Sequence, residues 1–264
     1  MQQQSAQLKS ADYWLQAKLP LNCLLFLAPL LVVYELGVIW LGGSRSDELR
    51  NGADHWMRGW LRQTGCERTL WLPLFVVAGL LAWQHVGKYR WKASPDALLG
   101  MFAESLLFAF CLVAIGQLQD LAFRHCQMVT TIAVEDCEIT ASNISFSTWQ
   151  QIVNYVGAGV YEEVLFRLCL LPLCYGAWRL LQLPRKPAMI LAVVLTSVLF
   201  SVAHYIGPAA DVFSMFSFTF RVLAGMFFAI LLVSRGFGIT VGSHVAYDLL
   251  VGIILATHGS PAAS

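Results

Sequence analysis

Two adjacent carboxylates and an arginine interrupt a long apolar segment of this 264-residue chain. Glu162, Glu163 and Arg167 lie in the stretch GVYEEVLFR, residues 159–167. An ionised side chain at the centre of a bilayer costs about 3 kcal/mol by insertion scales, so such residues indicate a structural or functional role. On a helix Glu163 and Arg167 share a face and can pair. Glu162 is rotated away by about 100°, and a carboxylate without a partner on its own helix is a candidate catalytic group.

Two further polar clusters lie in later apolar segments. The first is FSVAH, in which Phe200 precedes His204 by four residues. The second is HVAYD, in which His244 and Asp248 are four residues apart and therefore share a helical face. Together with Glu162, these clusters supply two imidazoles and two carboxylates in apolar surroundings. We therefore expect three helices to assemble one buried polar site.

Such a set of side chains permits two related reactions. In the first, Glu162 accepts a proton from a water held jointly with His204, and the hydroxide attacks a carbonyl. His244 and Asp248 then bind the oxyanion; Asp248 donates only if protonated, and otherwise orients His244 by accepting its ring proton. In the second, Glu162, His204 and His244 ligate a zinc ion whose bound water is the nucleophile. The commonest zinc-protease signature, HExxH, is missing from the sequence.

Non-catalytic membrane proteins use similar residues. A transporter or a proton relay places ionisable groups within its helices, and an immunity or interaction protein can retain them for packing. We expect the Glu163–Arg167 pair mainly to support the site structurally. Catalysis is favoured for Glu162, His204, His244 and Asp248 because four such residues occur together.

The composition is that of a membrane protein. Hydrophobic residues make up 58% of the chain and charged residues 12%, about half the charged fraction of a soluble domain. The net charge of +1 gives no indication of a nucleic-acid partner. Seven apolar segments are long enough to cross about 30 Å of hydrocarbon. They are residues 19–41, 70–86, 97–118, 149–181, 187–205, 212–233 and 237–256.

The fourth segment is too long for one straight span. Gly157, Gly159 or Pro172 can kink or divide it, which would add an eighth element. The sequence therefore predicts an all-α polytopic membrane protein of about seven to eight transmembrane helices. Within one integrated membrane domain, we expect residues 1–148 to form N-terminal helices, residues 149–256 the catalytic helical core, and residues 257–264 a C-terminal tail.

The basic residues predict the orientation of the chain. If the segments alternate, nine Lys and Arg fall on one side, which should be cytoplasmic together with the N-terminus. These are Lys9, Lys18, Lys88, Arg90, Lys92, Arg179, Arg185, Lys186 and Arg235. The opposite side holds a loop, residues 45–68, with five Arg. Its mixture of charges with Trp56 and Trp60 indicates an amphipathic helix that lies in the membrane interface.

Two early carboxylates and two loop cysteines carry weaker signals. Glu35 and Glu104 interrupt apolar segments, and we expect protonated or paired groups that stabilise helix packing rather than catalytic ones. Cys126 and Cys137 flank a hydrophilic loop and can form a disulfide if that loop faces an oxidising compartment. The spacing leaves that disulfide a hypothesis.

In this order on successive apolar segments, EExxxR, FxxxH and HxxxD resemble the three motifs of one membrane protease family. This is the CAAX-protease and bacteriocin-processing family of intramembrane glutamic endopeptidases. It includes the type II CAAX prenyl endopeptidase and the abortive-infection proteins. The resemblance covers residues 149–256. The first half, including Arg50-Asn51-Gly52-Ala53-Asp54, matches no motif with an assignable chemistry.

The resemblance implies peptide-bond hydrolysis within the membrane. It implies that Glu162 activates water with His204, that His244 and Asp248 stabilise the oxyanion, and that Glu163, Arg167 and Phe200 support the site. No cofactor is expected, with zinc as the alternative. Prenyl-protein members carry Asn at the position of Asp248, whereas many bacterial members carry Asp.

The expected partners are the lipid bilayer and a membrane-anchored peptide or protein substrate. Leader peptides, C-terminal sorting tails and other anchored peptides are candidates beside prenylated tails. A chain of this length without a further soluble domain is typical of bacterial members, so we expect the bacterial cytoplasmic membrane with the N-terminus inside. The oligomeric state is left open by the sequence.

Overall fold

The computed structural model is built of helices and, within the residues that it describes, contains no strand. The structure describes residues 13–43, 47, 49–66, 68–129, 148–207 and 210–255. Four of its helices are long and apolar enough to cross a membrane, namely Pro20–Gly42, Pro95–His125, Arg185–Ala203 and Met215–Arg235. Two shorter apolar helices accompany them. The all-α polytopic membrane fold that the sequence predicts is confirmed.

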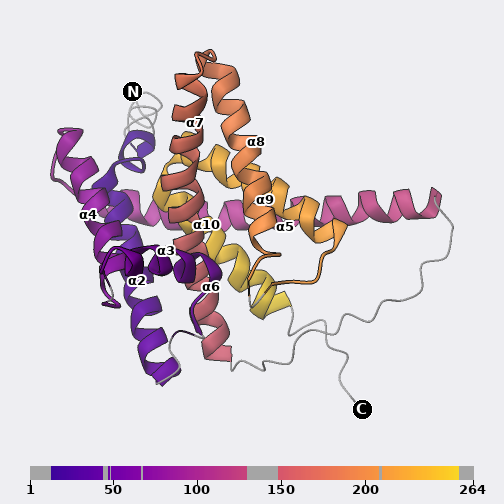
Figure 1. Ribbon diagram of the computed structural model, residues 1–264, viewed down its shortest axis with the longest axis horizontal. Coiled ribbons are helices and arrows are strands. Elements are labelled where there is room, and N and C mark those ends of the chain that lie inside the picture. Colours follow the sequence, from indigo (N-terminus) through magenta and orange to yellow (C-terminus); the bar gives the residue numbers. More distant parts are fainter. Residues whose placement is uncertain are drawn as a thin grey trace, which may run out of the picture.

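Apart from α3, the helices overlap the predicted apolar segments, and Figure 1 shows how they are arranged. They are α2 (Pro20–Gly42), α3 (Gly52–Gln63), α4 (Trp71–Val86), α5 (Pro95–Val129), α6 (Thr148–Glu163), α7 (Leu171–Leu180), α8 (Arg185–Ala203), α9 (Met215–Arg235) and α10 (Phe237–Leu249). Two π-helical segments, η2 (Val164–Leu170) and η3 (Leu250–Leu255), continue α6 and α10. Long apolar runs with few charges fold this way because a helix satisfies its own backbone hydrogen bonds in lipid.

Helix α10 lies at the centre of the fold. Every residue from Phe237 to Val245 is buried, and the helix packs against α2, α5, α6 and α9. A helix that is apolar all round needs neighbours on all sides. Small residues permit the close approach: Gly238 and Gly242 lie against side chains of α5 and α2, and Gly159 of α6 lies against Val245. This central position carries His244 into the interior.

The predicted break in the fourth apolar segment occurs at a π-helix. The chain stays α-helical through Gly157 and Gly159 and widens at Val164–Leu170. There, the amide of Leu171 donates to the carbonyl of Phe166, five residues back. Pro172 explains the site of the break, because it has no amide hydrogen and its ring clashes with the carbonyl four residues earlier in a regular helix. The glycines serve instead as close-contact positions.

The loop between the first two apolar helices contains the predicted amphipathic helix. It is α3, which begins after Asn51, whose side chain accepts a hydrogen bond from the amide of Asp54. Its buried face contains charged residues as well as Ala53 and Met57.

Both early intramembrane carboxylates are paired, as predicted: Glu35 with Arg58 and Arg50, and Glu104 with Arg235. Cys137 lies outside the described residues, so the disulfide hypothesis stays open.

Gly159→Ala is expected to destabilise the protein by about 1–3 kcal/mol, as overpacking of a core typically does. A β-carbon there would lie 2.8 Å from the backbone nitrogen of Val245, and the backbone of a fully surrounded helix cannot move aside easily. Thermal unfolding of the purified protein in detergent measures the effect.

Gly176→Ala is the matched control, because a β-carbon at this α7 position meets nothing within 4 Å. Alanine is the better helix former by up to about 1 kcal/mol, so this variant should unfold at the wild-type temperature or slightly above it. Equal losses in both variants would contradict the close packing of α6 on α10.

Candidate active site

The four predicted catalytic side chains meet where three helices converge. Glu162 lies at the end of α6, His204 directly follows α8, and His244 and Asp248 lie on α10. Their side chains are 13%, 24%, 6% and 19% exposed, so the site is recessed but reachable. These residues are far apart in the sequence. They meet because α6 packs on α10 and because η2, which continues α6, packs on α8.

One carboxylate oxygen of Glu162 faces both imidazoles. Its Oε2 atom lies 3.9 Å from Nε2 of His204 and 3.8 Å from Nε2 of His244. These separations exceed a direct hydrogen bond, so the groups face one another across a gap. Polar groups at this spacing can be joined by a bridging water.

The backbone fixes the tautomer of His204. Its Nδ1 atom lies 2.8 Å from the carbonyl oxygen of Phe200, one helical turn earlier. A carbonyl oxygen only accepts, so Nδ1 carries the proton and donates it. In the neutral imidazole, Nε2 is then an acceptor and faces Glu162. The side chains of the FxxxH motif also meet, because the Phe200 ring lies edge to face against His204 with ring centres 5.0 Å apart.

Glu163 orients the second imidazole. His244 donates from Nδ1 to Oε1 of Glu163 at 2.8 Å, and the other oxygen of Glu163 lies 3.1 Å from Nε of Arg167. The nearest oxygen of Asp248 lies 3.6 Å from Nε2 of His244, beyond hydrogen-bond distance. The carboxylate that accepts the ring proton of His244 is thus Glu163 rather than Asp248. Nε2 of His244 is left facing Glu162 and Asp248.

Arg167 is held in an aromatic cage. It is 3% exposed, and its guanidinium lies 4.4 Å from the ring centre of Phe200 and 5.6 Å from that of Phe228. One of its nitrogens also donates to the carbonyl of Gly225 at 3.3 Å. Desolvated cations gain from the faces of aromatic rings. Glu163 and Arg167 thus form the ion pair that their four-residue spacing allows, and the Phe200 ring covers the guanidinium.

Sequence reasoning missed two side chains that complete the site. Phe228 of α9 stacks on His244 with ring centres 4.6 Å apart and planes inclined by 14°. It occurs in a wholly apolar run and carries no distinguishing signal. Tyr161 precedes Glu162 and is fully buried, and its hydroxyl donates to Glu35 at 2.6 Å. An intramembrane carboxylate at residue 35 indicated that a partner was needed, although not which one.

The predicted zinc ligands do not form a recognisable metal site. Among the described residues, no three His, Cys, Asp or Glu side chains are grouped as a metal ion would require. Zinc sites place their donors about 2.0–2.2 Å from the ion for nitrogen and oxygen. We therefore derive no step through zinc, and zinc dependence stays a prediction.

The site lies within a segment that matches a known protein family. Residues 144–250 match the family model described as type II CAAX prenyl endopeptidase Rce1-like. This segment of the chain is therefore similar to the Rce1-like proteins. No curated protein and no solved structure matches the chain.

The Rce1-like segment contains Glu162, His204, His244 and Asp248, and it confirms the resemblance drawn from the three motifs. It covers α6 to α10 and leaves α2 to α5 outside. The match supports a hydrolase of the membrane that acts on peptide bonds.

Arg167→Met should destabilise the protein by about 3–5 kcal/mol, since the variant leaves Glu163 buried without its countercharge. Combining it with Glu163→Gln removes both charges and retains an amide oxygen that can accept from His244. The double variant should therefore recover part of the loss. Thermal unfolding of Arg167→Met, of Glu163→Gln and of the double variant gives the coupling free energy between the two residues. Strictly additive losses would contradict a buried ion pair at this position.

Proposed function

We propose that the protein is an intramembrane endopeptidase that hydrolyses a peptide bond of a membrane-associated substrate by water activated on Glu162 and His204. One observation carries the proposal: Oε2 of Glu162 faces Nε2 of two histidines at 3.9 and 3.8 Å, from three helices of the Rce1-like segment. Glu163, its chain neighbour, is occupied by Arg167 and His244. Glu162 is therefore the carboxylate available as a base.

Water activation follows from the orientation of His204. Because Nδ1 of this ring donates to a carbonyl, Nε2 can accept one hydrogen of a water while Glu162 accepts the other. Glu162 takes a proton from that water, and the hydroxide attacks the carbonyl carbon of the peptide bond. The recessed position strengthens these interactions, since fewer waters compete for the carboxylate.

The tetrahedral intermediate then needs hydrogen-bond donors for its oxyanion. His244 in its doubly protonated form donates from Nε2 while Nδ1–H stays bonded to Glu163. Asp248 donates if it is protonated, and as an ion it stabilises the charged imidazole. When the intermediate collapses, Glu162 returns its proton to the amide nitrogen, the C–N bond breaks and the amine leaves. Each proton taken from water is thus returned to a product.

The proposed substrate is a membrane-anchored peptide. Its cleaved bond lies within the bilayer or at the cytoplasmic surface of the membrane. Asp248 stands where prenyl-protein members carry Asn, so leader peptides and other membrane-anchored tails remain candidates beside prenylated ones. We further expect a bacterial cytoplasmic membrane with the N-terminus inside. Cysteine accessibility from either side of the membrane would test that orientation.

Glu162→Gln should abolish cleavage of co-expressed membrane-anchored peptides, with a loss on the order of 10²- to 10⁴-fold, because general base catalysis contributes that much. The substitution preserves the size of a side chain whose nearest charged partners among the described residues are two imidazole nitrogens at 3.8 and 3.9 Å, so the protein should stay folded. Asp120→Asn makes the same chemical change on α5, where the carboxylate is 46% exposed and pairs with Arg124. This control should cleave as well as wild type.

The alternatives give different results in the same preparations. Zinc dependence predicts stoichiometric metal and loss of activity with a chelator. A transporter or an immunity or interaction protein predicts no cleavage by wild type, and Glu162→Gln would then mainly change accumulation or transport. Full activity of Glu162→Gln would show that Glu162 is not the base and would refute the mechanism.

A further inference from the structure

Four charged side chains outside the Rce1-like segment form a closed ring of ion pairs. Glu35 of α2 accepts from Arg58 at 2.7 Å, and Arg58 donates to Asp54 at 2.6 Å. Asp54 accepts from Arg50 at 2.7 Å, and Arg50 also donates to Glu35 at 3.5 Å, which closes the ring. We call Glu35, Arg50, Asp54 and Arg58 the charge ring. It joins α2 to α3 and to the turn before it.

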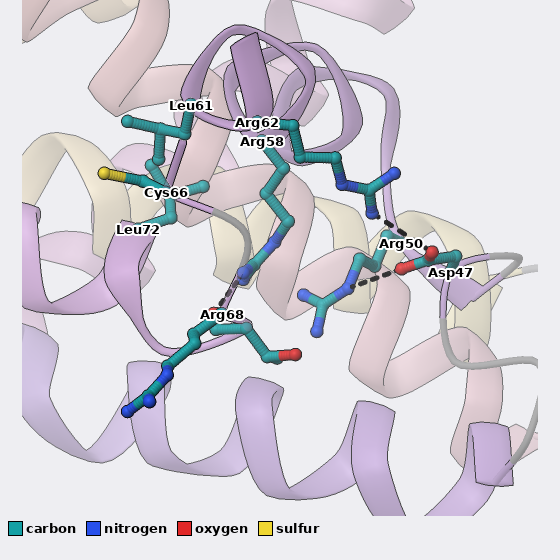
Figure 2. A pocket seen from close by; sticks show the side chains of 9 residues that line it. Asp47, Arg50, Arg58, Leu61, Arg62, Cys66, Arg68 and Leu72 are labelled. Atoms are coloured by element: carbon teal, nitrogen blue, oxygen red, sulfur yellow. Dashed lines mark hydrogen bonds and ion pairs between the residues drawn. The ribbon is translucent and has the colours of Figure 1, made fainter. Parts of the chain in front are cut away.

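The charge ring is buried and electrically neutral. Its side chains are between 0% and 8% exposed, and two positive charges balance two negative ones. Burial alone would lower the pKa of Arg50, but Asp54 and Glu35 raise that pKa above its ordinary value, so the guanidinium stays charged. Figure 2 shows Arg50 and Arg58 in the wall of a small cavity, where Asp47 links Arg50 to Arg62.

Two tyrosines bond to the carboxylates of the charge ring in matching ways. The hydroxyl of Tyr34 donates to Asp54 at 2.8 Å, and that of Tyr161 donates to Glu35 at 2.6 Å. Both side chains are fully buried, and their rings meet edge to face with centres 5.3 Å apart. They differ in one respect: Tyr34 belongs to α2, whereas Tyr161 belongs to α6 and precedes Glu162.

We propose that the charge ring positions Glu162 for catalysis through the hydrogen bond from Tyr161 to Glu35. The inference rests on the proposed function of Glu162 as the base. Tyr161 and Glu162 are consecutive on a helix, so a bond that fixes the first also fixes the rotation of α6 at the second. The N-terminal helices thereby act as a positioning element for a site to which they contribute no reacting group.

The rotation of α6 about its axis must be fixed near Glu162, because the helix geometry changes there. The regular helix ends at Glu163, and the wider η2 begins at Val164. On one side of α6, Glu163 bonds to His244; on another side, Tyr161 bonds to the charge ring. A rotation of roughly 10° moves a carboxylate about 6 Å from the helix axis by about 1 Å. A displacement of about 1 Å costs on the order of 10²-fold in rate.

The test is the pair Tyr161→Phe and Tyr34→Phe. Each removes one hydroxyl that bonds to the charge ring, and each keeps its aromatic ring, including the contact of the Tyr34 ring with Gly157. Tyr161→Phe should lower kcat on the order of 10- to 100-fold with little change in KM. Tyr34→Phe should lower the unfolding temperature as much as Tyr161→Phe does but leave kcat near the wild-type value. Glu35→Gln is avoided because an unpaired buried arginine can prevent folding.

Two results would overturn the proposal. The first is a kcat of Tyr161→Phe close to that of wild type, which would mean that the bond does not set the position of Glu162. The second is an equal fall of kcat in both variants, which would reflect general loosening of the charge ring. Glu162→Gln, measured beside them, separates the two proposals: an active Glu162→Gln variant refutes the proposed base, whereas an inactive Glu162→Gln beside a fully active Tyr161→Phe refutes only the positioning.

The chemical reactivity of Glu162 can be measured even if no substrate is cleaved. Dicyclohexylcarbodiimide modifies carboxyl groups in apolar surroundings, and tandem mass spectrometry of the labelled peptide separates Glu162 from Glu163. Tyr161→Phe should change the labelling rate of Glu162, whereas Tyr34→Phe should label it at the wild-type rate. Identical rates in wild type and Tyr161→Phe would refute the proposal whatever the chemistry of the site.

Discussion

The structure depends on the neutralisation of charges that are buried within an apolar protein. Ionised groups removed from water are tolerated only when partners and hydrogen bonds surround them. Two clusters beside Glu162 satisfy this requirement: the charge ring between α2 and α3, and the chain from Arg167 through Glu163 to His244. Glu162 lies between them, and its nearest charged partners in the described part of the chain are 3.8 and 3.9 Å away. The same constraint that stabilises its neighbours therefore leaves this carboxylate available for chemistry.

Adjacent glutamates on one helix thus take different roles because of rotation. Glu163 points to α10, where it holds His244, and is fully buried. Glu162 is turned by about 100° and faces the gap between two imidazoles. Aromatic rings from α8 and α9 complete the arrangement by covering Arg167 and His244. A pair of identical residues becomes a structural group and a candidate base through geometry alone.

Much of this could be predicted from the sequence, because apolar length and four-residue spacing are local properties. They placed the helices, the pair Glu163–Arg167 and the convergence of Glu162 with His204 and His244. They could not predict contacts that depend on how helices rotate against one another. The hydrogen bond from His244 to Glu163, the stacking of Phe228 and the bond from Tyr161 to Glu35 are all of this kind. The π-helix that follows Glu163 changes the rotation further, and only Pro172 indicated its position.

The charge ring also has a consequence for biosynthesis. All four of its residues lie between positions 35 and 58, whereas Tyr161 follows roughly a hundred residues later. Chains emerge from the ribosome N-terminus first, and early units form before later ones are made. The ring can therefore close while the second half is still being translated. We therefore expect Tyr161 to meet a formed acceptor when α6 is inserted, so that the first helices set the register in which the later segment packs.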